Sequence, residues 1–315
     1  MGKRLRALLL AAVMCAAFLS GCGVVYDMAE DYEWRWGTFG RVSFVSPVKL
    51  RVGVAPFSDE VGLGAAGAGA NLARLMTEEL GKNSNLLMVS MEDVQSAIYA
   101  RGYSLPLNSQ QAAEVAADLR LNAIVLGSLS EVRKYNLRKG WRRIARIVTD
   151  QREYVDAVLA VSAVDALTGI VLVSRANVGQ YDGGSGNKDF FEAGDREGHN
   201  PDQEALEASL DSALSESYHR TLSGLGSLPF KARVLSVYGG EAVIGFGADV
   251  GLKRGLDFAK LEVERVITNT IGESYQVMGA PIARLKVSAV DASTATLEIT
   301  EGHLSPGDII QTINY

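Results

Sequence analysis

Apolar residues recur at helical spacing in several segments of the chain. Leu72, Met76 and Leu80 fall on one face of a segment that Gly81 ends. Asn108 or Ser109 can cap another helix, and Asn200 followed by Pro201 is a typical helix start. We therefore expect helices over 70–80, 91–100, 109–119 and from 200 to the glycines that precede Pro229. The last helix should bury a face made of Leu206, Leu210, Ala213, Leu214 and Leu222.

Short runs rich in apolar and β-branched residues lie between these helices and predict strands. The expected strands cover 49–57, with a proline near the end, 86–89, and a stretch that begins at Ala123. Residues 154–164 and 170–174 predict a hairpin around the turn sequence Asp-Ala-Leu-Thr-Gly. Helices and strands mixed in this order indicate a sheet that is covered by helices.

The last part of the chain has period-2 patterning without a helical segment. Gly239-Gly240 separates two strand-like runs and is a two-residue hairpin signal. Two similar turns introduce strands near 257 and 309. In the first turn a glycine lies two residues before an aspartate, and in the second a glycine lies directly before one. Short strands at this spacing predict a small barrel. The expected strands are 232–237, 242–246, 257–266, 282–290, 294–299 and 309–313.

The first residues of the chain have the pattern of an export signal. Three basic residues precede an apolar run over 8–18, which is too short to cross a bilayer comfortably as a permanent helix. The following Leu19-Ser20-Gly21-Cys22 resembles a lipobox, in which the cysteine is acylated and becomes the new N-terminus. An ordinary cleaved signal with a chance cysteine is the alternative. Gly23, in place of an aspartate, resembles the signal for release to the outer membrane.

These patterns divide the chain into four parts. We expect a lipoprotein signal peptide at 1–21, an aromatic tether at 22–47, an α/β domain at 48–228 and a small β-barrel domain at 229–315. The predicted fold class is therefore α+β. The tether would join the folded part to the outer membrane through acyl chains on Cys22, on the periplasmic side, since each buried methylene contributes about 0.8 kcal/mol.

Charge and cysteine usage exclude several classes of function. The chain has a net charge of −6, and loss of Lys3, Arg4 and Arg6 with the signal leaves 28 basic against 37 acidic side chains. That balance argues against a nucleic-acid partner. The only cysteines are Cys15 and Cys22, so the mature domains have no thiol for catalysis or metal binding. The three histidines are scattered, and we expect no metal and no cofactor.

One motif suggests nucleotide chemistry. Gly62, Gly64 and Gly67 match G-x-G-x-x-G after a strand and before a helix. We interpret them as a loop for two reasons. Residues 58–61 separate the strand from the first glycine, whereas the dinucleotide turn is tight. Asp59 and Glu60 would also repel a pyrophosphate.

Two features are candidates for partner contacts. Arg142, Arg143 and Arg146 belong to a basic cluster in an otherwise acidic chain, and Trp34 and Trp36 lie in the tether. Arginine and aromatic residues are enriched at interfaces. The alternatives are solvated hairpin faces for the arginines and packing against the first domain for the rings.

The first domain resembles a superfamily that includes the curli-secretion lipoproteins and the N-terminal domain of TolB. Residues 49–57, 123–129 and 159–174 carry this resemblance. Residues 243–247 and 249–258 resemble the C-terminal, SH3-like barrel of flagellar assembly protein T. The resemblance implies a non-enzymatic outer-membrane lipoprotein that assembles in an envelope complex, with a flagellar basal-body ring as its most specific form, and a homo-oligomer. A secretion-channel subunit and a nucleotide-binding enzyme are the alternatives.

Replacement of Cys22 by serine tests the proposed anchor. Because the thiol accepts the lipid, the variant should be unacylated and soluble in the periplasm, and mass spectrometry of the wild type should find lipid on residue 22. A mature wild-type N-terminus at another residue, without lipid, would contradict this prediction.

Overall fold

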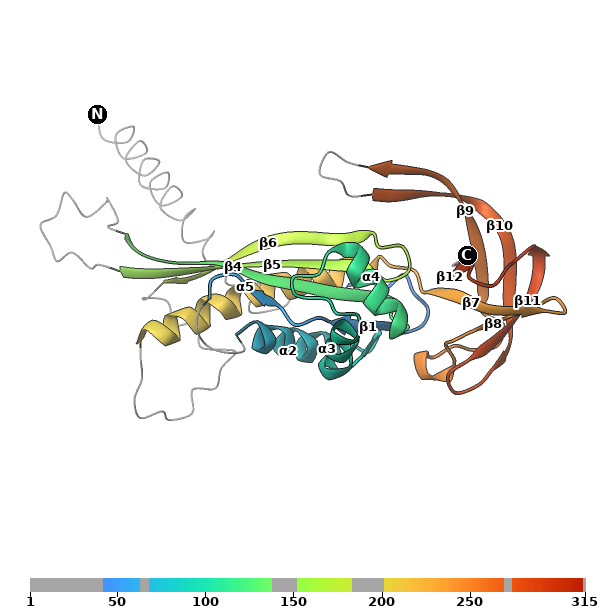
Figure 1. Ribbon diagram of the computed structural model, residues 1–315, viewed down its shortest axis with the longest axis horizontal. Helices are drawn as coiled ribbons and strands as arrows, with labels where there is room; N and C mark the ends of the chain where they lie inside the picture. The colour runs from blue at the N-terminus through green and yellow to red at the C-terminus, as the bar shows by residue number, and fades with distance from the viewer. Residues whose placement is uncertain (1–41, 63–67, 138–151, 183–200, 269–273, 314–315) are drawn as a thin grey trace, which may run out of the picture. The chain divides into compact units, whose positions relative to one another are not determined.

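The computed structural model describes residues 42–62, 68–137, 152–182, 201–268 and 274–313 (Figure 1). Residues Phe44–Tyr315 form one compact unit. Within it lie a mixed sheet with four helices and a closed barrel. The mixed α and β content and the barrel confirm the coarse fold class expected from the sequence. The division of the chain at residue 228 stays a prediction.

The sheet has the strand order β3-β1-β4-β5-β6. Its first half is parallel, with β1 between β3 and β4, and its second half is an antiparallel meander of β4, β5 and β6. A short strand, β2, continues from β1 and pairs in parallel with the middle of β4. The strands are β1 (Leu50–Val54), β2 (Ser58–Asp59), β3 (Leu86–Met88), β4 (Ala123–Leu137), β5 (Arg152–Asp165) and β6 (Val171–Asp182).

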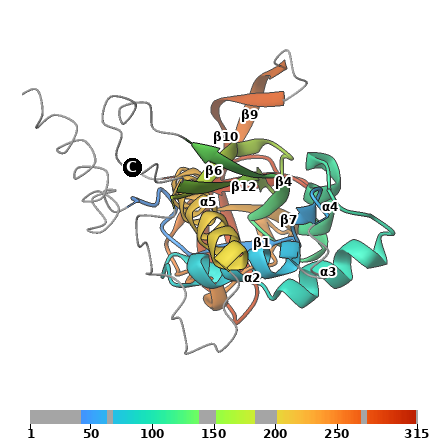
Figure 2. The same ribbon diagram turned by 90° about the vertical axis from the view of Figure 1, so that its left-hand side faces the viewer.

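Helices cover both faces of this sheet, but one face only in part. The helices are α2 (Ala68–Gly81), α3 (Met91–Ala100), α4 (Ser109–Asp118) and α5 (Pro201–Gly226). Of the two cap candidates in the sequence, Asn108 caps α4, in a capping box with Gln111. Helices α3 and α4 pack on one face of the sheet, where Val94 and Val115 lie in the same buried cluster as Ile124 of β4. Helix α5 lies along β5 and β6 on the opposite face (Figures 1 and 2).

The buried face of α5 differs from the predicted one. Leu206 and Leu210 are only half-buried, although Ala213, Leu214 and Leu222 are buried as expected. The fully buried ridge instead repeats every four residues and is made mostly of small side chains: Ala205, Ser209, Ala213, Ser217, Thr221 and Leu225.

Small side chains on this ridge let the α5 backbone approach β6 closely. A Cβ on Gly179 would lie 1.8 Å from the carbonyl oxygen of Ser209, so only glycine fits there. The Ser217 hydroxyl accepts a hydrogen bond from the Asn177 amide of β6 at 2.8 Å and donates to the Ala213 carbonyl. These bonds satisfy the buried hydroxyl group of Ser217, and the Ser209 hydroxyl donates to the Leu206 carbonyl in the same way.

The C-terminal residues close into a barrel with the order β10-β11-β8-β7-β12-β9. Gly239 and Gly240 both have positive φ (61° and 85°) in the β7–β8 turn, as a two-glycine hairpin requires. Gly255 and Gly307, in the two similar turns noted in the sequence, also have positive φ. The strands are β7 (Lys231–Tyr238), β8 (Glu241–Ile244), β9 (Asp257–Thr268), β10 (Ser274–Val290), β11 (Ala295–Gly302) and β12 (Ile309–Thr312).

A buried polar network connects the sheet to the first barrel strand. The Asn122 side chain accepts from the Arg51 amide at 2.9 Å and donates to the Lys231 carbonyl at 2.8 Å. The Lys231 ammonium is 2.5 Å from a carboxylate oxygen of Asp165, whose other oxygen accepts from the Leu167 amide. Asn122 and Asp165 are each only 1% exposed. This network therefore fixes the end of β5, the start of β4 and the start of β7 relative to one another.

We expect Lys231→Met to lower the free energy of unfolding by about 3–5 kcal/mol, because it leaves the Asp165 carboxylate buried without a counter-charge. The double variant with Asp165→Asn should recover most of the loss, since the asparagine oxygen still accepts from the Leu167 amide. Urea denaturation of the mature chain measures both. A single variant as stable as the wild type would show that the ion pair contributes little to stability.

Candidate docking surface

Three strands leave one face of the sheet open where α3 and α4 do not reach. Cross-strand neighbours on this face of β5 and β6 are identical residues: Val158 opposite Val178, Ala160 opposite Ala176, and Ser162 opposite Ser174. Leu126 and Ser128 continue the same rows on β4. We call these eight residues the open face. Most of its side chains are small, all are half-buried or exposed, and Val178 is 60% exposed.

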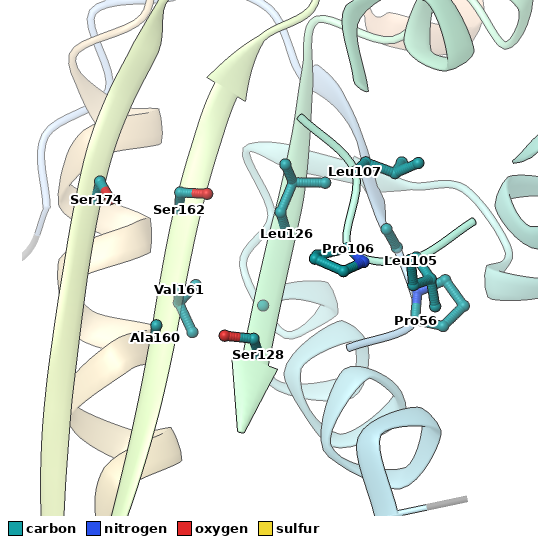
Figure 3. Close-up of a pocket in the computed structure, with 12 residues that line it drawn as sticks. Pro56, Leu105, Pro106, Leu107, Leu126, Ser128, Ala160, Val161, Ser162 and Ser174 are labelled. Atoms are coloured by element: carbon teal, nitrogen blue, oxygen red, sulfur yellow. The ribbon is translucent and has the colours of Figure 1, made fainter. Parts of the chain in front are cut away.

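A pocket of about 140 Å³ lies at one end of the open face (Figure 3). Its floor includes Leu126 and the hydroxyl groups of Ser128 and Ser162. Its wall comes from the loop after α3, whose residues 105–107 (Leu-Pro-Leu) stand over β4. An apolar cavity of about 150 Å³ is enough for a benzene-sized group, so the pocket can accept one apolar side chain of a partner.

The chemistry of the pocket favours binding over catalysis. None of its lining residues is ionisable: Ala55, Pro56, Leu105, Pro106, Leu107, Leu126, Gly127, Ser128, Ala160, Val161, Ser162 and Ser174. A serine nucleophile needs a neighbouring base, and the pocket lining supplies no histidine, lysine or carboxylate. Apolar walls with a few hydroxyl groups instead match a neutral, partly apolar ligand such as a protein segment.

A second exposed apolar surface lies on the barrel. Beyond Leu261 and Pro281, β9 and β10 pair only with each other among the described strands, as a two-stranded ribbon that Figure 1 shows extending from the barrel. Val263 and Met278 are opposite each other on one side and are 47% and 40% exposed. Glu262 and Glu264 alternate with Val263 and occupy the other side.

The described residues do not include the site residues that the sequence singled out. Cys22, Trp34 and Trp36 lie before residue 42, and Arg142, Arg143 and Arg146 lie within 138–151. Their roles therefore stay predictions. Among the described residues, no group of three or more histidine, cysteine or acidic side chains could hold a metal ion, and no helix is long and apolar enough to span a membrane.

The glycine motif is described only at Gly62, and the geometry there agrees with a loop. The chain does not turn from β1 into a helix but continues as β2 beside β4. The Asp59 carboxylate accepts hydrogen bonds from the amides of Val61 (3.2 Å) and Gly62 (2.9 Å). Amides that could face a phosphate in a dinucleotide turn are therefore bonded to an acid of the protein itself.

Sequence reasoning missed the open face, although a signal for it exists. Val-x-Ala-x-Ser over 158–162 and Ser-x-Ala-x-Val over 174–178 are mirror images of each other. The predicted hairpin ended at Ser174, whereas β6 continues to Asp182. The second half of the pattern therefore fell outside the predicted strand.

An acidic cavity of about 220 Å³ lies between α2 and α5. Burial, together with the nearby charge of Glu79, raises the pKa of Asp211 to about 6. Tyr218 and His219 also line this cavity, and burial raises the pKa of the first and lowers that of the second. Lys82 forms an ion pair with Glu79 nearby. Asp211 thus destabilises the fold when it is ionised.

No known family profile and no curated protein matches the chain. Several solved structures are similar to part of it. They include the hypothetical protein CT253 from Chlamydia trachomatis (15% identity, 56% of this chain and 98% of that one, TM-score 0.38). The lipoprotein GNA1162 from Neisseria meningitidis has 13% identity over 44% and 88% (TM-score 0.31), and the LpoB C-terminal domain from Salmonella enterica has 15% over 43% and 86% (TM-score 0.28). These values carry no functional argument.

We expect the ionisation of Asp211 to reduce the stability of the folded state as the pH rises from about 4 to 6. The folded state holds the Asp211 proton more tightly than the unfolded state does, because its pKa is raised from 3.8 to about 6. Asp211→Asn should therefore add about 1 kcal/mol at pH 7.5, after allowance for partial exposure, and almost nothing at pH 4. Thermal denaturation at both pH values measures this difference. An equal gain at both would contradict the assignment to Asp211.

Proposed function

We propose that this protein is a non-enzymatic, lipid-anchored scaffold of the bacterial envelope, held at the outer membrane by Cys22. The open face and its pocket would bind a neutral segment of another envelope protein. The observation that carries the proposal is the pocket lining, which combines three leucines, two prolines and serine hydroxyl groups without an ionisable side chain. The lipobox at 19–22 supplies the location.

Physical considerations support a protein ligand over a small metabolite. The pocket is small and opens onto a flat row of small side chains, so an extended chain could lie on the row with one side chain inserted. Buried hydroxyl groups in an apolar site also need partners, and peptide N–H and C=O groups can provide them.

The most specific form of this proposal is a component of a flagellar basal-body ring, and it rests on the sequence resemblance alone. Loss of motility on deletion of the gene, with restoration by the wild type, would support it. A secretion-channel subunit is the alternative within the same class. The rival enzyme would bind nucleotide at Gly62–Gly67, and calorimetry that gave a micromolar Kd for NAD or ATP, lost on Gly64→Val, would favour it.

A photo-crosslinking residue at Leu105 tests the docking surface in cells. We expect it to join the full-length protein to another envelope protein, because residue 105 lines the pocket and is 38% exposed. Ser162→Arg should reduce the crosslinked product about tenfold or more, since it puts an unpaired charge into the apolar site. Ser236→Arg, at an exposed position of the barrel, is the matched control and should leave the product unchanged.

The same experiment separates the contacts that the sequence suggested. If the arginines 142, 143 and 146 lead the contact, reversing their charge should remove the product and high salt should weaken it, because exposed charges are screened beyond about 8 Å at physiological ionic strength. A contact led by Trp34 and Trp36 should resist salt. A product at Leu105 that survives Ser162→Arg would overturn the role of the open face.

A further inference from the structure

The strand β6 forms a long edge of the sheet. Its pairing with β5 runs from Val171 to Asp182, and among the described residues it has no strand on its other side. From Val173 to Asp182 this pairing is regular, and a register shift occurs only at its first residues. Ser174, Ala176 and Val178 are exposed on the face of β6 that α5 does not cover, and Val178 is 60% exposed. Arg175, on the other face, is exposed as well.

Exposed edges are normally protected, because their unpaired N–H and C=O groups are a template for another strand. The other edge of this sheet is short, with only the three residues Leu86–Met88 of β3. Strand β6 has twelve residues, no proline and no lysine, and its single basic residue is Arg175. It is therefore neither short nor protected by proline or lysine. It also carries an exposed valine, Val178.

We propose that β6 pairs with β6 of a second copy of this chain, in antiparallel orientation about a two-fold axis at Val178. The two sheets would then continue across the joint with the open face on the same side in both copies. A two-fold axis is the symmetry by which one strand edge can pair with itself. This inference rests on the proposed function only for the location, since the membrane anchor would bring two copies together at the same membrane.

The side chains support this register. An axis at Val178 places the two Val178 side chains opposite each other, and Val158 lies beside each of them in its own sheet. Four valines would thus form one apolar row across the joint and cover side chains that are exposed in a single copy. On the other side of the sheet, Arg175 comes opposite Tyr181, where a guanidinium can lie against an aromatic ring.

Disulfide trapping tests the register in the full-length, lipidated protein in cells. Because the mature chain has no free thiol once Cys22 is acylated, Val178→Cys introduces the only one. Directly opposed residues of antiparallel strands have Cα atoms about 4.5–5.5 Å apart, which a disulfide can bridge. We expect oxidant treatment to convert most of this variant to a dimer on a non-reducing gel.

Two control variants make the result specific. Ala176→Cys is also exposed on β6, but in this register its two copies are four residues out of step, about 13 Å apart along the strands, and cannot bridge. Leu235 is a position on the barrel that is 50% exposed, and the dimer yield of Leu235→Cys measures the background from random collisions in the membrane. Dimer yields at Val178→Cys no greater than those of either control would overturn the proposal.

A third variant tests pairing without a cysteine. Val178→Lys introduces two like charges at the axis, where natural edge strands carry lysine to prevent pairing, and should weaken dimerisation about tenfold or more in analytical ultracentrifugation. An unchanged dissociation constant would overturn the proposal. The Leu105 crosslink to another envelope protein is a separate readout: its absence in a chain that still dimerises would count against the proposed function alone.

Discussion

The buried amide of Asn122 is the point on which the arrangement of this protein depends. Its backbone and side chain bond to both backbone groups of Arg51, to the Ala166 amide and to the Lys231 carbonyl. Four segments that are distant in sequence therefore meet at one residue that is 1% exposed. Buried hydrogen bonds are directional, in contrast to apolar packing, so they select one orientation of these segments. The ion pair between Asp165 and Lys231 adds an electrostatic attraction between two of these segments.

Much of the fold could be predicted from the sequence because caps and tight turns depend on interactions between residues that are close in the chain. Asn108 caps α4 through bonds within three residues, and the two glycines at 239 and 240 determine their turn by themselves. The buried ridge of α5 could not be found in this way. Serine and threonine look polar in a hydrophobic pattern, and only the close approach at Gly179 explains why Ser209, Ser217 and Thr221 face the sheet.

The candidate site was harder to predict than the fold. The features of the sequence that suggested function are charge, aromatic rings and glycine spacing, and they lie outside the described ranges or in the loop at Gly62. The open face has none of these marks, because alanine, serine and valine are ordinary residues of a strand. What makes it distinct is a cross-strand coincidence between β5 and β6, which exists only once the register of Ala160 opposite Ala176 is known.

That coincidence has a consequence for recognition. Because β5 and β6 are antiparallel and their residue types run in reverse order, both strands present serine, alanine and valine in the same spatial order along the sheet. A bound extended chain would meet this order whether it lay over β5 or over β6. Its direction, in contrast, is distinguished by the row, which has hydroxyl groups at one end and valines at the other. The Leu105–Leu107 wall stands at the serine end and adds to this difference. The sheet would therefore read the direction of a ligand while it tolerates a sideways shift by one strand.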